Sequence, residues 1–219
     1  DGIRDVAVTG VQTCALPISP KQVGALTNWK SVSAGQYHPI AVKTDGTLWS
    51  WGYNGNGQLG TGNPTNYSSP KQIGILTNWS TVSAGGVANG YAIKTNGTIW
   101  SWGSNVYGQL GTNNTTYYSS PKQVGALTNW SNLSGSLYCV AAIKTDGTLW
   151  SWGINNVGQL GIGNTYYYSS PKQVGSLTNW SSLGTSMPNA SGTVVMTAVK
   201  TDGTLWAWGD NSYGQVGQG

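Results

Sequence analysis

The chain has 219 residues, of which 7% are charged, with 33 glycines, 12 tryptophans, 12 tyrosines and no phenylalanine. This is not the composition of a disordered chain, and no apolar run approaches the roughly 20 residues of a membrane-spanning helix. The net charge of +4 comes from ten cations and six anions, with the lysines scattered along the chain. Because nucleic-acid-binding proteins usually cluster Lys and Arg on one surface, we expect no nucleic-acid groove.

The first 19 residues differ in character from the rest of the chain. Residues 8–19 resemble the in-frame translation of a common sequencing-library adapter, and the resemblance stops where a repeated pattern begins. The segment also lacks the basic start and apolar core of a signal peptide. We therefore predict a non-native leader over residues 1–19. Cys14 would then be foreign, leaving Cys139 alone and the protein without a disulfide framework.

A pattern of about 50 residues fills the remainder, since Ser19-Pro20-Lys21-Gln22 returns at Ser69, Ser120 and Ser170. A fixed period of this size indicates a propeller or a solenoid. The pattern divides the chain into four predicted repeats, residues 20–69, 70–120, 121–170 and 171–219. Function must then be sought in what differs between the repeats.

Each repeat contains a predicted β-hairpin around an Asp-Gly or Asn-Gly pair, at residues 45–46, 96–97, 146–147 and 202–203. In the first repeat a two-residue type I′ turn at Asp45-Gly46 would place Val42 opposite Trp49 and Ile40 opposite Trp51. One face of the hairpin would then be bulky and aromatic. The other would carry the mostly small side chains of Ala41, Lys43, Leu48 and Ser50.

Two further strands, over residues 21–26 and 29–35 in the first repeat, complete four strands, the content of one propeller blade. We therefore predict an all-β propeller of four-stranded antiparallel blades, with about four blades forming an open arc. The tryptophans expected to be buried between blades are Trp49, Trp51, Trp100, Trp102, Trp150, Trp152, Trp206 and Trp208. The open arc leaves two unpaired blade faces that could self-associate.

A glycine-rich loop follows each hairpin, for example residues 52–60. Such loops cradle phosphate when a helix follows them, and no helix is predicted here. Asn and Gly at these positions therefore predict a tight turn rather than a phosphate site.

The hairpin and loop together resemble the regulator of chromosome condensation repeat family. The resemblance is carried by Asp45-Gly46, by residues 49–54 and by Gly57-Gln58-Leu59-Gly60, recurs three more times, and spans residues 20–219. It implies a β-propeller, usually seven-bladed, of which this chain would be a fragment. The eukaryotic founder of the family promotes nucleotide exchange on a small GTPase and binds chromatin. The tryptophan-rich, near-identical repeats are more similar to bacterial and metagenomic members with an extracellular or cell-surface binding function.

The chain is not predicted to be an enzyme. His38 is its single histidine, and the equivalent positions hold Asn89, Cys139 and, across an insertion, about Val195. These residues cannot supply a converging metal site, and no Ser-His-Asp set or pair of carboxylates is present. We therefore expect no catalytic residue, no metal and no cofactor.

Binding is predicted at the loop that varies most between repeats, which should open on one face of the propeller. The candidate partner-binding residues in this loop are Tyr37, His38, Tyr91, Tyr138, Met187 and Asn189. The partner would be an unknown protein or a glycan. Neutral drift in an exposed loop would give the same variation. The alternative function is a guanine-nucleotide exchange or chromatin-type regulatory propeller.

Overall fold

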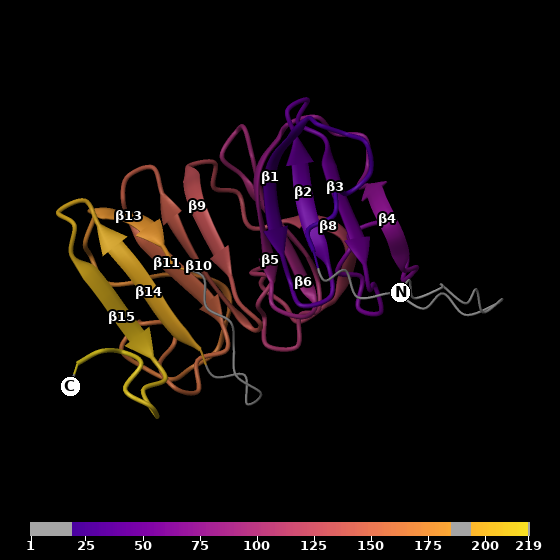
Figure 1. Cartoon of the computed structure of the whole chain (residues 1–219). Coiled ribbons are helices and arrows are strands. Elements are labelled where there is room, and N and C mark those ends of the chain that lie inside the picture. Colours follow the sequence, from indigo (N-terminus) through magenta and orange to yellow (C-terminus); the bar gives the residue numbers. More distant parts are fainter. Residues whose placement is uncertain (1–18, 185–193, 219) are drawn as a thin grey trace, which may run out of the picture.

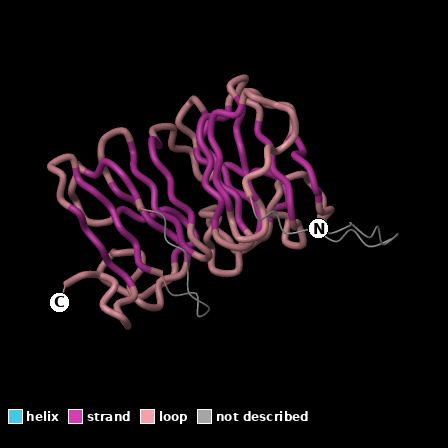
Figure 2. Tube along the Cα trace, in the orientation of Figure 1, coloured by secondary structure: helices cyan, strands magenta, loops and turns pink. Residues whose placement is uncertain are grey.

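The computed structural model describes residues 19–184 and 194–218, which form fifteen β-strands in four sheets and no helix (Figures 1 and 2). The first two sheets hold β1 (Trp29–Ala34), β2 (Pro39–Lys43), β3 (Leu48–Gly52), β4 (Tyr67–Gln72), β5 (Trp79–Gly85), β6 (Asn89–Lys94), β7 (Ile99–Gly103) and β8 (Tyr118–Gln123). The other two hold β9 (Trp130–Gly135), β10 (Cys139–Lys144), β11 (Leu149–Gly153), β12 (Tyr168–Gln173), β13 (Trp180–Leu183), β14 (Val195–Lys200) and β15 (Leu205–Gly209). A helix able to cross a membrane is therefore absent from the described residues.

Each sheet is one blade, with its strands paired antiparallel in chain order. Blade 1 is β1–β4, blade 2 is β5–β8, blade 3 is β9–β12 and blade 4 is β13–β15. The first strands of neighbouring blades contact one another, as β1 does β5 and β5 does β9, so they form the inner edge of the arc. The all-β fold of antiparallel blades is confirmed.

The boundaries of the blades differ from those of the sequence repeats. Each Ser-Pro-Lys-Gln copy at residues 69–72, 120–123 and 170–173 lies in the last, outer strand of a blade rather than in its first. The prediction of a strand over residues 21–26 is wrong, because residues 19–28 form no strand. Blade 4 has three strands instead of four, since residues 210–218 form turns and irregular backbone.

The hairpin turn also differs from the prediction. The loop is three residues long, because the Lys43 amide donates to the Thr47 carbonyl (3.0 Å) and the Gly46 amide to the Lys43 carbonyl (2.9 Å). Of the loop residues only Gly46 has a positive φ, of 78°. Asp45 instead accepts the Thr47 amide through its side chain (3.0 Å), as in an Asx turn. A type I turn followed by a glycine bulge therefore replaces the expected type I′ turn.

The longer loop shifts the pairing of β2 with β3 by one residue, so each tryptophan of the hairpin lies opposite a different residue than predicted. Ala41 lies opposite Trp49, and Val42 opposite Leu48. Since directly opposed residues share a face, each blade has a tryptophan face and an aliphatic face. In blade 1 the tryptophan face carries Ala41, Trp49 and Trp51, and the aliphatic face carries Ile40, Val42 and Leu48.

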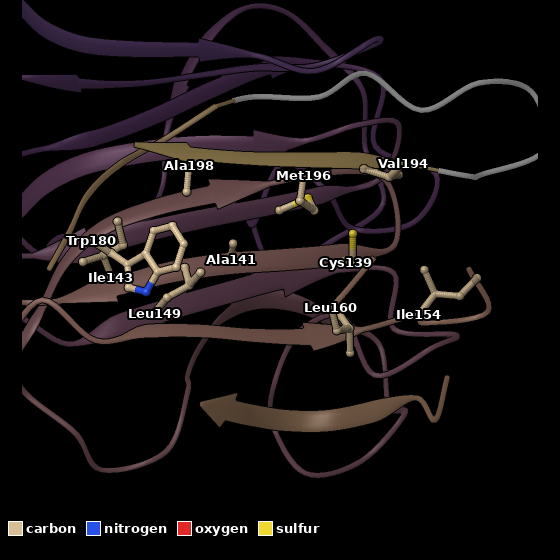
Figure 3. Close-up of a cluster of buried hydrophobic side chains, with 10 residues drawn as sticks. All are labelled: Cys139, Ala141, Ile143, Leu149, Ile154, Leu160, Trp180, Val194, Met196 and Ala198. Carbon is tan, nitrogen blue, oxygen red and sulfur yellow. The ribbon is translucent and has the colours of Figure 1, made fainter. Parts of the chain in front are cut away.

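The core lies between blades, where the aliphatic face of one blade packs against the tryptophan face of the next. Between blades 1 and 2, Ile40, Val42 and Leu48 contact Trp79 and Trp102. The same arrangement joins blade 2 to blade 3 and blade 3 to blade 4, the last with Leu149, Trp180 and Met196 among its members (Figure 3). No such cluster joins blade 4 to blade 1 among residues 19–184 and 194–218, so the predicted open arc is confirmed.

The predicted burial of the tryptophans holds fully for the second tryptophan of each internal hairpin. Trp102 and Trp152 are completely buried. The first tryptophan of the hairpin is half-buried in blades 1 to 3, and Trp206 in blade 4 is 46% exposed. Burial therefore depends on having a neighbouring blade and an outer strand, and not on the tryptophan alone.

The second tryptophan also forms a hydrogen bond between blades. Trp102 Nε1 donates to the Gln58 carbonyl of the preceding blade (2.8 Å), and Trp152 Nε1 to the Gln109 carbonyl (2.9 Å). Gly60, with φ 72°, permits this approach, because a Cβ there would lie 2.9 Å from Trp102 Nε1. The Gly-Gln-Leu-Gly segment thus forms a structural turn, as the sequence predicted. This turn also contacts the tryptophan of the next blade.

Candidate functional site

The variable loops and the glycine-rich loops meet at one end of the blades, which we call the loop rim. β1 and β3 both run toward this end, and the Tyr53 amide donates to the Tyr37 carbonyl across it (3.0 Å). The Ile154 amide likewise donates to the Tyr138 carbonyl (2.9 Å). The loop rim therefore lies opposite the Asp-Gly turns, and it carries the loops that differ most between repeats.

In blades 1 to 3, the long loop after the third strand is held by one buried asparagine. Asn105 is completely buried, and its Nδ2 donates to the carbonyls of Asn114 (2.9 Å) and Thr116 (3.0 Å). Its Oδ1 accepts the amide of the core residue Leu110 (2.9 Å). Asn54 and Asn155 occupy the equivalent positions in blades 1 and 3. These hydrogen bonds hold the glycine-rich loops of blades 1 to 3 in place at the loop rim.

Tyrosine side chains gather on the loop rim in two clusters. Tyr107 of blade 2 contacts Tyr138 and Tyr167 of blade 3 edge to face, with ring centroids 4.9 and 5.7 Å apart. In blade 1 the rings of Tyr37 and Tyr53 lie 6.2 Å apart. Tyr37, Tyr53 and Tyr167 are each about half exposed. These rings form a broad surface that is apolar across the ring and polar at the hydroxyl.

The structure places the predicted site residues in different environments. Tyr37 is exposed and Tyr138 is half-buried on the loop rim. His38 and Tyr91 are completely buried, so their side chains are part of the core and do not reach the surface. The lengthened loop of the fourth repeat, with Met187 and Asn189, lies outside the described residues.

Sequence reasoning missed three of the five clustered tyrosines. Tyr53 and Tyr107 lie in the glycine-rich loop, and Tyr167 precedes the outer strand β12. The comparison of repeats pointed only to the loop between the first and second strands. The sequence could have indicated them, because other residues replace these tyrosines at equivalent positions of the other repeats. For example, Ser104 stands where blade 1 has Tyr53.

Tyr91 is buried because it lies on the aliphatic face of blade 2, opposite Ser101. Its hydroxyl donates to the Gln109 carbonyl (3.2 Å), and burial raises the pKa of the phenol well above its usual value. The neighbouring Cys139 thiol is also completely buried, which raises its pKa to about 12. Because a thiolate is needed for nucleophilic attack, this cysteine is inert at neutral pH.

His38 lies between blades 1 and 2, where its Nε2 is 2.8 Å from the Asn89 carbonyl. Since a carbonyl can only accept, Nε2 carries the proton. Nδ1 is buried and has no hydrogen-bond partner among the described residues. Burial lowers the pKa of the imidazole below its ordinary value, partly offset by the bond to Asn89. His38 is therefore a neutral core residue at pH 7.

A pH dependence of stability follows from His38. Its folded pKa lies below the ordinary value of about 6.5, so the unfolded chain binds the proton more readily. The contribution of His38 to stability is present well above the unfolded pKa of about 6.5 and is lost as the pH falls through and below that value. Urea unfolding at several pH values should show this slope in the wild type, and H38Q should flatten it. An unchanged slope in H38Q would contradict the assignment.

The carboxylates of the hairpin turns do not contribute to the change in stability in this pH range. Hydrogen bonds from Thr47 and Thr148 hold the pKa values of Asp45 and Asp146 below their usual range. Their contribution is present above the unfolded value of about 3.9 and is lost only at lower pH. The window from pH 7 to 5 therefore isolates His38.

The end of each blade opposite the loop rim carries a buried lysine over a tryptophan. Lys94 Nζ lies 3.8 Å from the ring centroid of Trp100, and Lys144 Nζ lies 3.7 Å from that of Trp150. Burial lowers the pKa of both lysines. These lysines stabilise the blade by cation–π contact with its tryptophan, and they are not arranged to bind phosphate.

The residues that the structure describes hold no group of three or more His, Cys, Asp or Glu side chains able to bind a metal. Two surface cavities, each of about 230 Å³, lie at equivalent places between blades 1 and 2 and between blades 3 and 4. Both are lined by the two glycines and the tryptophan pair of the blade junction, such as Gly60, Gly74, Trp79 and Trp100. Their recurrence marks them as part of the architecture rather than as a specialised ligand site.

Comparison with known families gives matches along most of the repeated region. The family model described as "Regulator of chromosome condensation (RCC1) repeat" matches residues 45–87, 96–143 and 146–183, which together make up more than half of the chain. The chain belongs to the RCC1 repeat family. A second RCC1 repeat model matches residues 29–58, 79–109 and 196–215. The resemblance inferred from the sequence is confirmed.

Curated relatives match the RCC1 repeats over part of their length. The human probable E3 ubiquitin-protein ligase HERC6 is 35% identical over 121 residues, which is 52% of this chain and 12% of that protein. The mitochondrial RCC1 domain-containing protein RUG3 of Arabidopsis thaliana is 32% identical over 112 residues, 50% of this chain and 25% of that protein. The human regulator of chromosome condensation is 26% identical over 110 residues. The chain thus spans no more than about a quarter of these relatives.

Solved RCC1-repeat structures share the fold. Yeast RCC1 (Prp20) in complex with Kap60 superposes with a TM-score of 0.78 over 92% of this chain and 48% of that chain, at 19% identity. Human WBSCR16 gives 0.73 over 86% of this chain and 49% of that chain, at 22% identity. Prp20p of Saccharomyces cerevisiae, whose binding properties to Gsp1p and histones have been described, gives 0.76 over 92% of this chain and 50% of that chain, at 19% identity. These relatives are eukaryotic, so none supports the expected bacterial source.

Proposed function

We propose that this RCC1-repeat chain is a non-catalytic binding platform that engages a protein partner through its loop rim. The observation that carries the proposal is the cluster of Tyr107, Tyr138 and Tyr167, in which two blades combine to present aromatic rings. The Tyr37–Tyr53 pair extends the same surface over blade 1. A bacterial source and an extracellular or cell-surface location remain predictions of the sequence.

The chemistry of the loop rim favours a protein partner. Tyrosine supplies contact area with few rotatable bonds and is enriched at protein interfaces. Tyr107 and Tyr167 are positioned by the loops that the buried Asn105 and Asn155 hold against the blade cores. Protein binding is also described for yeast RCC1 (Prp20), with Kap60, Gsp1p and histones as its partners.

The test is to select peptides from a displayed library on the immobilised chain and to probe a glycan array in parallel. We expect enriched peptides whose affinity falls at least about tenfold when Tyr107, Tyr138 and Tyr167 are all changed to Ser. The matched control changes Leu76, Leu127 and Leu177 to Ser, because these exposed side chains follow the outer strands at the end opposite the loop rim. Equal loss in both variants, or binding to the glycan array alone, would refute the proposal.

A nucleotide-exchange role is the alternative that the sequence raised. It rests on the relatives, and no feature of the described surface of this chain adds to it. If the chain is a passive platform, it will not accelerate nucleotide release from a small GTPase. Acceleration of release would replace our proposal with the alternative.

A further inference from the structure

The hairpin turn of blade 2 differs from the other three hairpin turns at one position. Asn96 stands where the other blades have an aspartate, and a glycine follows in every blade. The equivalent aspartates are Asp45, Asp146 and Asp202. The backbone of the turn is the same, since Gly97 has a φ of 73° and Gly46 a φ of 78°. Blade 2 therefore carries a neutral amide at a position where the other turns carry a carboxylate.

The amide makes longer contacts in this turn than a carboxylate does. Asn96 Oδ1 accepts the Thr98 hydroxyl at 2.8 Å and the Thr98 amide at 3.2 Å. The corresponding bonds to Asp146 are 2.6 and 2.9 Å long. Lys144 has Asp146 as a charged neighbour, whereas the turn beside Lys94 holds the neutral Asn96. Conversion of Asn96 to aspartate would therefore give blade 2 the shorter hydrogen bonds and the charge pair of blade 3.

The same contacts activate the Asn96 side chain towards its neighbour. Deamidation begins when the backbone nitrogen of the next residue attacks the side-chain carbon Cγ, and Gly97 has no Cβ to hinder this attack. Negative charge then develops on Oδ1, where the Thr98 hydroxyl and amide already donate. Donors aimed at a developing oxyanion lower the barrier to such an attack. The bond from the Gly97 amide to the Lys94 carbonyl (2.9 Å) must open first, which makes the reaction slow.

The other three Asn-Gly pairs of the chain lack this combination. Asn54 and Asn89 are completely buried, and their side-chain amides donate to backbone carbonyls. Asn56 is exposed, but its side chain accepts no hydrogen bond among the described residues, and Gly57 is buried against the outer strand of blade 2. Asn96, by contrast, is exposed and lies beside a surface cavity of about 380 Å³.

We propose that Asn96 is a site of spontaneous deamidation whose aspartate product stabilises the hairpin turn. The Gly97 nitrogen forms a bond to Cγ, the bond from Cγ to Nδ2 breaks, and ammonia leaves with the Gly97 amide proton. The product is a five-membered succinimide. Water then opens this ring, at Cγ to give aspartate or at the backbone carbonyl to give isoaspartate. In the net reaction, asparagine and water become aspartate or isoaspartate and ammonia.

The reaction ends at aspartate because the turn keeps that carboxylate ionised. Hydrogen bonds from Thr47 and Thr148 hold the pKa values of Asp45 and Asp146 below their usual range. An ionised carboxylate is a poor electrophile, so the Asp-Gly turns do not re-form the succinimide at neutral pH. The site lies at the end of the blades opposite the loop rim, so it can hold or fail independently of the proposed function.

The first test follows the reaction in the folded full chain, kept at mildly alkaline pH and mapped by peptide mass spectrometry. We expect Asn96 to convert at least about tenfold faster than Asn54 and Asn89, whose reaction needs a larger opening of the fold. T98V should slow the conversion at least about threefold, because one oxyanion donor is lost, and T98S should restore it. Loss of structure would speed the reaction, so it cannot explain a slower T98V. Asn96 converting no faster than Asn54 and Asn89, or T98V at the wild-type rate, would overturn the proposal.

The second test moves the site to blade 3 and does not depend on the Thr98 variants. D146N creates an Asn-Gly pair beside Thr148 in the same turn geometry, so we expect it to deamidate at a rate comparable to that of Asn96. N96D should raise the melting temperature by roughly 1–3 °C and D146N should lower it similarly, since one gains and the other loses a charge pair. A D146N chain that keeps its new amide while Asn96 reacts, or an N96D chain that melts at a lower temperature than wild type, would contradict the proposal.

Discussion

W152A is expected to lower the stability of the chain by roughly 3–5 kcal/mol, the usual cost of removing a large buried aromatic side chain. Trp152 is completely buried between blades 2 and 3, where it packs with Val140 and Ile99. It also donates the hydrogen bond to Gln109 that joins the blades, so the substitution leaves both a cavity and an unmet carbonyl. The melting temperature should fall by on the order of 10 °C.

The repeat supplies its own control for this measurement. Trp51 holds the same position in blade 1 but is half-buried, because no blade precedes it among the described residues. W51A, measured by thermal unfolding, should lower the stability less than half as much as W152A. Equal losses would mean that packing within one blade, rather than between blades, sets the stability.

N105A should lower the free energy of unfolding by roughly 2–4 kcal/mol, the second largest effect we expect. Asn105 is completely buried and makes three hydrogen bonds to the backbone of its loop. Alanine would leave two carbonyls and one amide without a partner, each at a cost of about 1–3 kcal/mol unless water enters. Urea unfolding measures the loss.

The matched control is N211A. Asn211 holds the equivalent position after blade 4 and bonds the Val216 amide (3.0 Å), but it is exposed to solvent. Water can replace that bond, so N211A should change stability by less than about 1 kcal/mol. If N105A proved as mild as N211A, the buried asparagine would not be what orders the loop rim.

The sequence by itself determined the repeat, the all-β blade architecture and the family. The period of about 50 residues and the recurring Asp-Gly, Trp-Ser-Trp-Gly and Gly-Gln-Leu-Gly segments are local patterns, and a local pattern repeated four times predicts a blade array without tertiary information. The resemblance to RCC1 repeats rested on the same segments and was confirmed by the family match.

The hairpin register could not be predicted from the Asp-Gly pair alone. Asp-Gly suits a two-residue type I′ turn and also the last two positions of a three-residue loop with a glycine bulge. The second outcome prevails here, with the Asp45 side chain accepting the Thr47 amide. That single residue of difference moved Ala41 and Lys43 to the face that carries Trp49, and it decided which face packs against which blade.

The tertiary structure alone decided which side chains are accessible. Tyr37 and Tyr91 were both predicted to lie in the variable loop, yet Tyr37, before β2, is half exposed and Tyr91, within β6, is completely buried. The reason is that strand register and the neighbouring blade, and not residue type, determine solvent contact. The tyrosine cluster of Tyr107, Tyr138 and Tyr167 likewise exists only because two blades bring together residues that are far apart in the sequence.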